Sequence, residues 1–222
     1  MHIHKPKGFH NLKEFMAEIS VIIVGILIAL SAEQLIEWIH IESKLSETRE
    51  ALRAELSIDA ANLKAMNDEN ACADARLNLL QDWSDGKVQV NTAHLASMQS
   101  RPLLWTLPIT AWEVTESTGV MAHMPIKERL AYAEVYDELA NERTHIWDER
   151  RAWDLLARYA GKTTLDPLEA RTLKADLGTV RIRDDDRRLN TPSILAAIGH
   201  LGIQPGSPPQ GRNPQELCQA PK

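Results

Sequence analysis

The feature that most constrains this chain is an uncharged stretch near its start. Residues Ile19 to Ala32 are fourteen consecutive positions without a charge, almost all of them Ile, Val, Leu or Ala. A bilayer core of about 30 Å requires about 20 helical residues. Extending the stretch to Phe15 on one side and Ile39 on the other supplies this length and leaves the charges near the ends. The sequence therefore predicts a transmembrane helix at residues 15–39.

Two other structures are compatible with such a stretch. A core helix of a soluble protein often contains about 10–14 apolar residues in a row, but here the apolar positions lie all around the helix. A secretory signal also has a basic start and an apolar centre, and Ala29-Leu30-Ser31 could be its small-x-small cleavage site. We favour an uncleaved anchor, because Glu18 directly precedes the apolar stretch and no helix-breaking residue follows it.

Charge is unevenly distributed about the predicted span. The tail of residues 1–14 carries Lys5, Lys7, Lys13 and Glu14, a net charge of +2 in a chain of −6, so the remainder carries −8. Positive charge close to a span favours the cytoplasmic side, so we expect a cytoplasmic N-terminus and an extracytoplasmic domain. Because an acidic domain gains nothing from phosphate contacts, no nucleic acid is expected as a partner.

The composition of the remaining chain predicts an all-α fold. Ala, Leu, Glu and Arg dominate, and they are good helix formers. Neither Gly nor Pro occurs from Ile26 to Asp85, and apolar residues recur between Leu45 and Leu80 mostly at steps of three, four or seven. That spacing is typical of one buried helical stripe. We expect the transmembrane helix to continue into an antiparallel helical bundle at residues 40–204, with a coiled coil between copies as another use of the stripe.

Local signals predict the ends of the other helices. Asn67–Asn70 is expected to kink or turn the long helix, and the remaining signals are helix caps and breakers. They predict a short helix after Asn91 and Thr92 through Ser100, a helix at 110–124, a helix at 126–160 between Pro125 and Gly161, a helix capped by Asp166 with Glu169 in a capping box, a break at Asn190-Thr191-Pro192, and a disordered proline-rich tail at 205–222.

The candidate helix-packing interface is a stripe on the predicted transmembrane helix. Gly25-x-x-x-Ala29 has the small-xxx-small spacing that lets two helix backbones approach closely, and Glu33 follows four residues later. An acid at membrane depth is expensive and indicates a functional role. Glu33 could instead lie in the headgroup region and only solvate the end of the span. This stripe predicts a homo-oligomer in membrane lipid.

The two cysteines, Cys72 and Cys218, are too few for a disulfide framework and too far apart for a zinc site. They could pair with each other in an oxidising compartment, or Cys72 could be a buried thiol.

Other chemical patterns occur without the residues that would complete a site. Glu37…His40 and Glu142…His145 have the Glu-x-x-His spacing of di-iron bundles, but further core carboxylates are not evident. Asp184–Asp186 lies among four arginines and is interpreted as a helix face of paired charges. No phosphate-binding loop or nucleophile motif is present. We therefore expect no cofactor, no metal site and no catalytic activity.

The first forty residues contain an HKPK segment, an EF…E pair, the apolar GILIAL segment and an EQ pair that follows it. In these segments the chain resembles an uncharacterised family of bacterial single-pass membrane proteins. The resemblance implies a bacterial membrane location but no mechanism. Together with the orientation expected from charge, we expect the bacterial inner membrane with a periplasmic domain.

Two functions from different classes fit these observations. The first is a membrane-anchored helical interaction or scaffold protein that self-associates or holds an unidentified membrane protein. The second is an extracytoplasmic ligand sensor, which would need a separate membrane partner because a fourteen-residue tail cannot itself signal.

Overall fold

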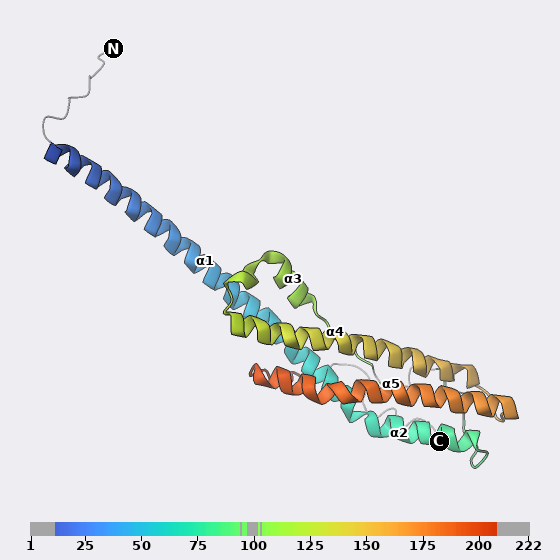
Figure 1. The fold of residues 1–222 in the computed structure, drawn as a ribbon. Helices are drawn as coiled ribbons and strands as arrows, with labels where there is room; N and C mark the ends of the chain where they lie inside the picture. Colours follow the sequence, from blue (N-terminus) through green and yellow to red (C-terminus); the bar gives the residue numbers. More distant parts are fainter. Residues whose placement is uncertain (1–11, 94, 97–101, 103, 208–222) are drawn as a thin grey trace. The chain divides into compact units, whose positions relative to one another are not determined.

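The computed structural model describes residues 12–93, 95–96, 102 and 104–207, and these are mostly helical with no strand among them (Figure 1). This confirms the predicted all-α class. The helices are α1 (Leu12–Asp68), α2 (Asn70–Ser84), α3 (Thr110–Thr118), the 3-10 turn η2 (Val120–His123), α4 (Ile126–Leu155), the 3-10 turn η3 (Leu156–Tyr159) and α5 (Pro167–His200). The chain divides into two compact units, Met1–Glu47 and Thr48–Lys222.

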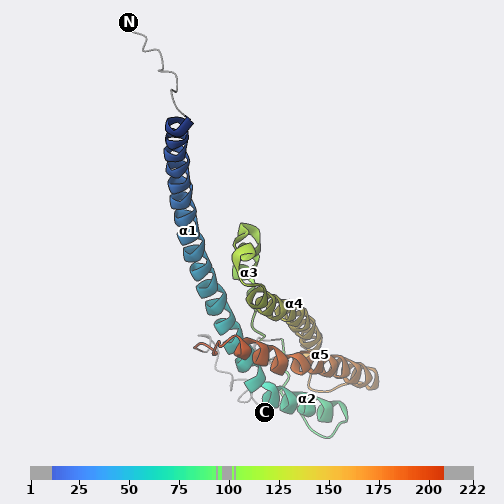
Figure 2. The same cartoon turned by 60° about the vertical axis from the view of Figure 1, so that its left-hand side comes forward.

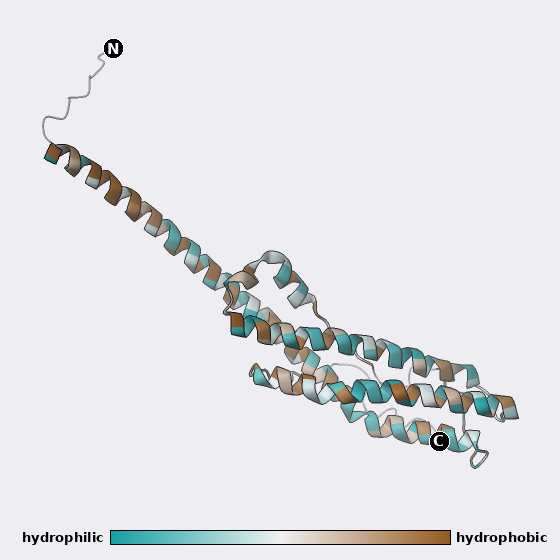
Figure 3. Cartoon of the chain, in the orientation of Figure 1, coloured by the Kyte–Doolittle hydropathy of each residue, from teal (hydrophilic) through white to brown (hydrophobic). Residues whose placement is uncertain are grey.

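The described part of the first unit is the beginning of α1. Hydrophobic residues predominate along it (Figure 3), and it contains the one described stretch that is long and apolar enough to cross a membrane. None of that apolar window is buried. Its two hydroxyl groups, on Ser20 and Ser31, donate to the carbonyl oxygens of Met16 and Leu27 at 2.8 and 2.7 Å. Both polar groups are therefore satisfied within the helix, as lipid would require.

The second unit is built on the end of α1 together with α2, α4 and α5. The last three helices lie alongside one another in both views (Figures 1 and 2), and α5 contacts both α2 and α4. Their shared core is apolar, with Leu77 and Leu80 from α2, Trp153 from α4, and Leu173 and Leu177 from α5. The apolar faces of these amphipathic helices bury one another, which is the main source of stability for helices of this length.

The end of α1 also holds the ends of the later helices. Arg49 forms a bidentate pair with Glu128 near the start of α4, at 2.7 and 2.9 Å. Arg53 donates to the carbonyl oxygens of Leu201 and Gly202 just after α5, both at 2.9 Å. These contacts set the positions of α4 and α5 against the same helix.

Several predicted helix ends are confirmed. The long helix stops at Asp68 and restarts at Asn70, within the predicted polar interruption. Asp166 caps α5 in a complete capping box with Glu169, and Pro167 occupies the first turn. Gly161 has a φ of 77°, the left-handed conformation in which glycine commonly follows a helix. The helix predicted at 110–124 instead ends at Thr118, because Gly119 takes up the left-handed conformation with a φ of 71°.

Two further predictions about helix ends are wrong. The described residues after Asn91 form turns rather than a helix, because the Thr92 hydroxyl donates to the Lys162 carbonyl oxygen and the Thr92 carbonyl accepts from the Gly161 N–H. The remainder of that predicted helix, and most of the predicted tail, lie outside the described residues. Pro192 does not break α5, which continues to His200.

Candidate functional site

The predicted packing stripe lies on the first part of α1, with Gly25, Ala29 and Glu33 all exposed. A side chain built at Gly25 would meet no atom within 4 Å. Packing within the described chain therefore does not require a glycine here. The structure leaves this face uncovered by the described residues.

A surface depression of about 760 Å³ continues the stripe toward the end of the span. Its lining includes Ala29, Ala32, Glu33, Ile36 and His40, all on α1. Small and apolar residues thus give way to ionisable ones along a single helix face.

Cys72 is half-buried on α2. Cys218 lies outside the described residues, so the disulfide between them stays a prediction.

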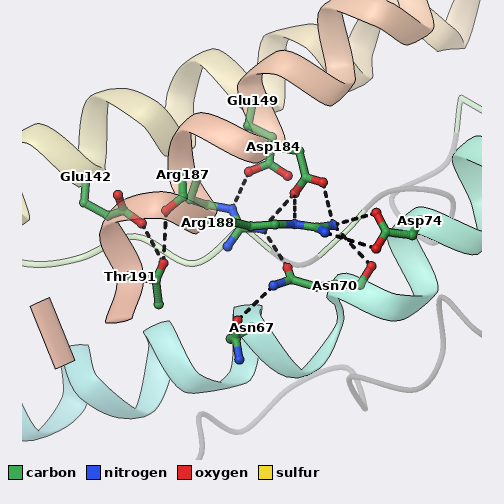
Figure 4. Close-up of polar contacts among 9 residues, drawn as sticks. All are labelled: Asn67, Asn70, Asp74, Glu142, Glu149, Asp184, Arg187, Arg188 and Thr191. Atoms are coloured by element: carbon green, nitrogen blue, oxygen red, sulfur yellow. Dashed lines mark hydrogen bonds and ion pairs between the residues drawn. The ribbon is translucent and has the colours of Figure 1, made fainter. Parts of the chain in front are cut away.

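The second candidate site is a polar cluster in the core of the second unit (Figure 4). At its centre, Arg187 of α5 is 1% exposed. Its Nε donates to Glu149 of α4 at 2.5 Å, and its Nη2 donates to Asp184 at 3.0 Å and to Asn70 of α2 at 2.9 Å. One residue therefore connects three helices.

Arg188 extends the cluster toward α2. It donates to Asp184 at 2.8 Å and to both carboxylate oxygens of Asp74 at 3.0 and 3.1 Å. It also donates to the Asn70 carbonyl oxygen at 3.2 Å. The break in the helix at Glu69 is what brings the start of α2 within reach of these arginines.

The interpretation of Asp184–Asp186 as a helix face of paired charges is thus only half right. Charges do pair, but Asp184 and Arg187 are buried, whereas Asp185 is exposed. Burial of Asp184 raises the pKa of its carboxyl, and the adjacent guanidinium groups of Arg188 and Arg187 oppose that rise.

Glu142 of α4 lies next to this cluster and is fully buried. Its Oε1 lies 3.1 Å from the Thr191 hydroxyl oxygen, which also lies 3.2 Å from the Arg187 carbonyl oxygen. Its Oε2 has no hydrogen-bond partner among the described residues. Burial raises the pKa of Glu142 to about 7.

Asp59, near the end of α1, is a second fully buried carboxyl. Neither of its oxygens has a hydrogen-bond partner among the described residues. Burial raises its pKa to about 8, with a further contribution from the neighbouring charge of Glu55, while Arg143 of α4 acts in the opposite direction.

The described residues contain no group of three or more His, Cys, Asp or Glu placed to hold a metal ion. The Glu142…His145 pair is not brought together with a further carboxylate for such a site. Glu142 meets Thr191 instead.

A signal for the buried acids was present in the helical spacing. Glu142 and Glu149 fall at steps of three and four between the apolar core positions Leu139, Ile146 and Trp153. Asp59 likewise falls between Leu56 and Leu63. A buried stripe defined by apolar residues alone does not include these acids, although their spacing places them on the core face.

Comparison of the chain with protein-family models, curated proteins and solved structures finds no match.

Proposed function

We propose that this chain is an anchored interaction or scaffold protein of a bacterial inner membrane, which self-associates through the exposed face of its membrane helix. The observation that carries the proposal is the apolar window of α1, none of which is buried by the rest of the described protein. Such a surface is unfavourable in water. A soluble core helix would be covered, and a helix continuing through Ala29-Leu30-Ser31 without a break favours an anchor over a cleaved signal.

Self-association is supported by Gly25. Glycine inside a helix costs roughly 1 kcal/mol relative to alanine, and no contact with the described residues requires one here. In lipid, helices associate through close backbone packing, and a Gly-x-x-x-Ala face permits this approach. The partner is a second copy, whose Gly25, Ala29 and Glu33 would occupy the same face at the same depth.

The orientation follows from charge. The basic tail would lie in the cytoplasm and the acidic domain in the periplasm.

Within that domain, Tyr159 pairs with Asp176, Glu149 with Arg187 and Glu142 with Thr191. Along these three pairs the residue number decreases on η3 and α4 while it increases on α5. The two helices therefore run in opposite directions, which supports an antiparallel bundle.

The test of self-association is the variant Gly25→Ile in the full-length protein. The added branched side chain separates the two backbones, so we expect association to weaken by about tenfold, or about 1.4 kcal/mol. Cross-linking in membranes and the mass of the purified protein in detergent measure the change. Glu33→Gln tests whether that acid also lies between the helices.

The matched control is Ser31→Ile, which adds similar bulk on another side of the same helix. Wild type and control should associate equally, and all variants should remain inserted. An unchanged oligomer population in Gly25→Ile would show that this face is not the interface.

One observation favours the alternative, an extracytoplasmic sensor acting through an unidentified membrane partner. The core of the second unit contains carboxyl groups without matching donors, and such groups respond to a change of environment.

A further inference from the structure

Four of the buried acids in the second unit differ in the charges that they contact. Glu149 and Asp184 contact the guanidinium groups of Arg187 and Arg188, whose charges oppose the rise in pKa that burial causes in both carboxyls. Asp59 and Glu142 are equally buried, but neither forms an ion pair with a described residue. An ionised carboxylate in such a place lacks both water and an ion-pair partner, which is the costly case for a buried charge.

The contacts of Glu142 indicate which form the carboxyl takes. The Thr191 hydroxyl carries one hydrogen, yet its oxygen lies within hydrogen-bond distance of two acceptors, the Arg187 carbonyl oxygen at 3.2 Å and Glu142 Oε1 at 3.1 Å. A protonated Glu142 resolves this conflict. It donates to the Thr191 oxygen, and the Thr191 hydroxyl donates to the carbonyl.

We propose that Asp59 and Glu142 form a proton-operated switch: both carboxyls are protonated in the packed domain, and loss of their protons loosens α4 from α1 and α5. Asp59 lies on α1, where the charge of Arg143 of α4 acts on it, and Glu142 lies on α4 with its Oε1 3.1 Å from the Thr191 hydroxyl oxygen of α5. α4 is therefore the helix that both carboxyls affect. The ligand of the sensor would be the proton.

The surrounding charges agree with this assignment. Glu138 and Glu149 of α4 and Arg187 of α5 act on Glu142. Around Asp59 the groups are Glu55 on its own helix, with Arg143 and Tyr136 on α4. In each set the arginine favours the ionised carboxylate and lowers its pKa. Burial and the neighbouring acids raise the pKa by more, so the protonated carboxyl is favoured.

The direction of the pH effect follows from the raised pKa values. Asp59 has its pKa raised from 3.8 to about 8, and Glu142 from 4.5 to about 7. Between these limits Asp59 and Glu142 bind more protons in the packed domain than in the unfolded chain, so their contribution to stability is fully present at low pH and is lost as pH rises toward about 8. This window includes neutral pH.

The experiment uses full-length protein in detergent, as wild type and as Asp59→Asn with Glu142→Gln. These amides keep the size of the carboxyls but cannot ionise. The control pair is Glu134→Gln with Asp137→Asn, two exposed acids on α4. Infrared spectra record the protonated carboxyl band, and amide hydrogen exchange, corrected for the intrinsic effect of pH, records the packing of α4.

At pH about 6, where exposed acids are ionised, wild type and control should show a protonated carboxyl band that is diminished in the amide variant. Corrected exchange in α4 should rise about tenfold or more between pH about 6 and about 9 in wild type and control, and by less than about twofold in the amide variant.

The proposal is overturned if wild type lacks the protonated band near pH 6, or if the amide variant shows the same pH-dependent exchange as wild type. The infrared result on wild type stands even if the variant does not fold. All the groups involved belong to the second unit, so failure of the Gly25→Ile test would leave this inference intact.

Discussion

At the scale of single residues, Arg187 is the group on which the polar core depends. It is fully buried, and its guanidinium contacts acids from two helices, Glu149 on α4 and Asp184 on α5. Side chains of this kind are seldom buried without such partners. The acids in turn are compensated because the arginine lies between them.

We predict that Arg187→Met destabilises the domain by about 3–5 kcal/mol, because it leaves Glu149 and Asp184 buried with less compensating charge. Urea unfolding followed by circular dichroism measures the change. Arg183→Met is the control, since Arg183 is exposed and pairs with Asp186 at 3.2 Å within one helix turn. An exposed pair of this kind contributes about 1 kcal/mol or less. Equal losses in the two variants would contradict the role assigned to Arg187.

At the scale of helices, α5 combines a strong start with an interior proline. Pro192 has no backbone N–H to donate to the preceding turn of the helix. Because Pro192 lies on the exposed side of α5, water is available near the carbonyl group that loses this donor. The neighbouring hydroxyls of Thr191 and Ser193 donate to the carbonyl oxygens of Arg187 and Asn190. Packing of Ile194 and Ile198 in the core then holds the last turns in line. Tertiary contacts thus override the local tendency of proline to end a helix.

The start of α5 depends on Asp166, whose Oδ1 accepts from the N–H groups of Leu168 and Glu169, both at 2.8 Å. We predict that Asp166→Ala lowers the free energy of unfolding by about 1 kcal/mol, the usual value of an N-cap side chain. Asp185→Ala, at an exposed position inside the same helix, should change it by less than about 0.5 kcal/mol. Thermal or urea unfolding compares them, and a loss as large in the Asp185 variant would argue against a capping effect.

At the scale of the whole molecule, the proposed orientation is the property to test first. We predict that a cysteine replacing Ser207, in a Cys72→Ser and Cys218→Ser background, reacts with a membrane-impermeant maleimide once only the outer membrane is permeabilised. The reason is the basic tail of residues 1–14 opposite a remainder of net charge −8. A cysteine replacing His2 is the control and should react only after the inner membrane is lysed. The reverse pattern would place the domain in the cytoplasm.

The sequence alone determined the features that depend on local chemistry. The apolar stretch at residues 15–39, the turn near Glu69, the capping box at Asp166 and the glycine after Tyr159 were predictable, because each depends on residues within a few positions of one another. The candidate membrane stripe at Gly25, Ala29 and Glu33 could also be named from sequence, since helical spacing alone places these residues on one side.

Only the tertiary structure decided which partners the buried polar residues meet. Asp184 and Asp185 are adjacent and chemically alike, yet one is buried against two arginines and the other is exposed. The arginines that contact Asp184 are in turn bonded by Asn70 and Asp74, from a helix more than a hundred residues away. The same holds for Glu142, whose donor or acceptor role depends on Thr191 of α5. Helical spacing places these residues on the core face, but it does not say which residue of a distant segment each one meets, so packing alone determines the pairings.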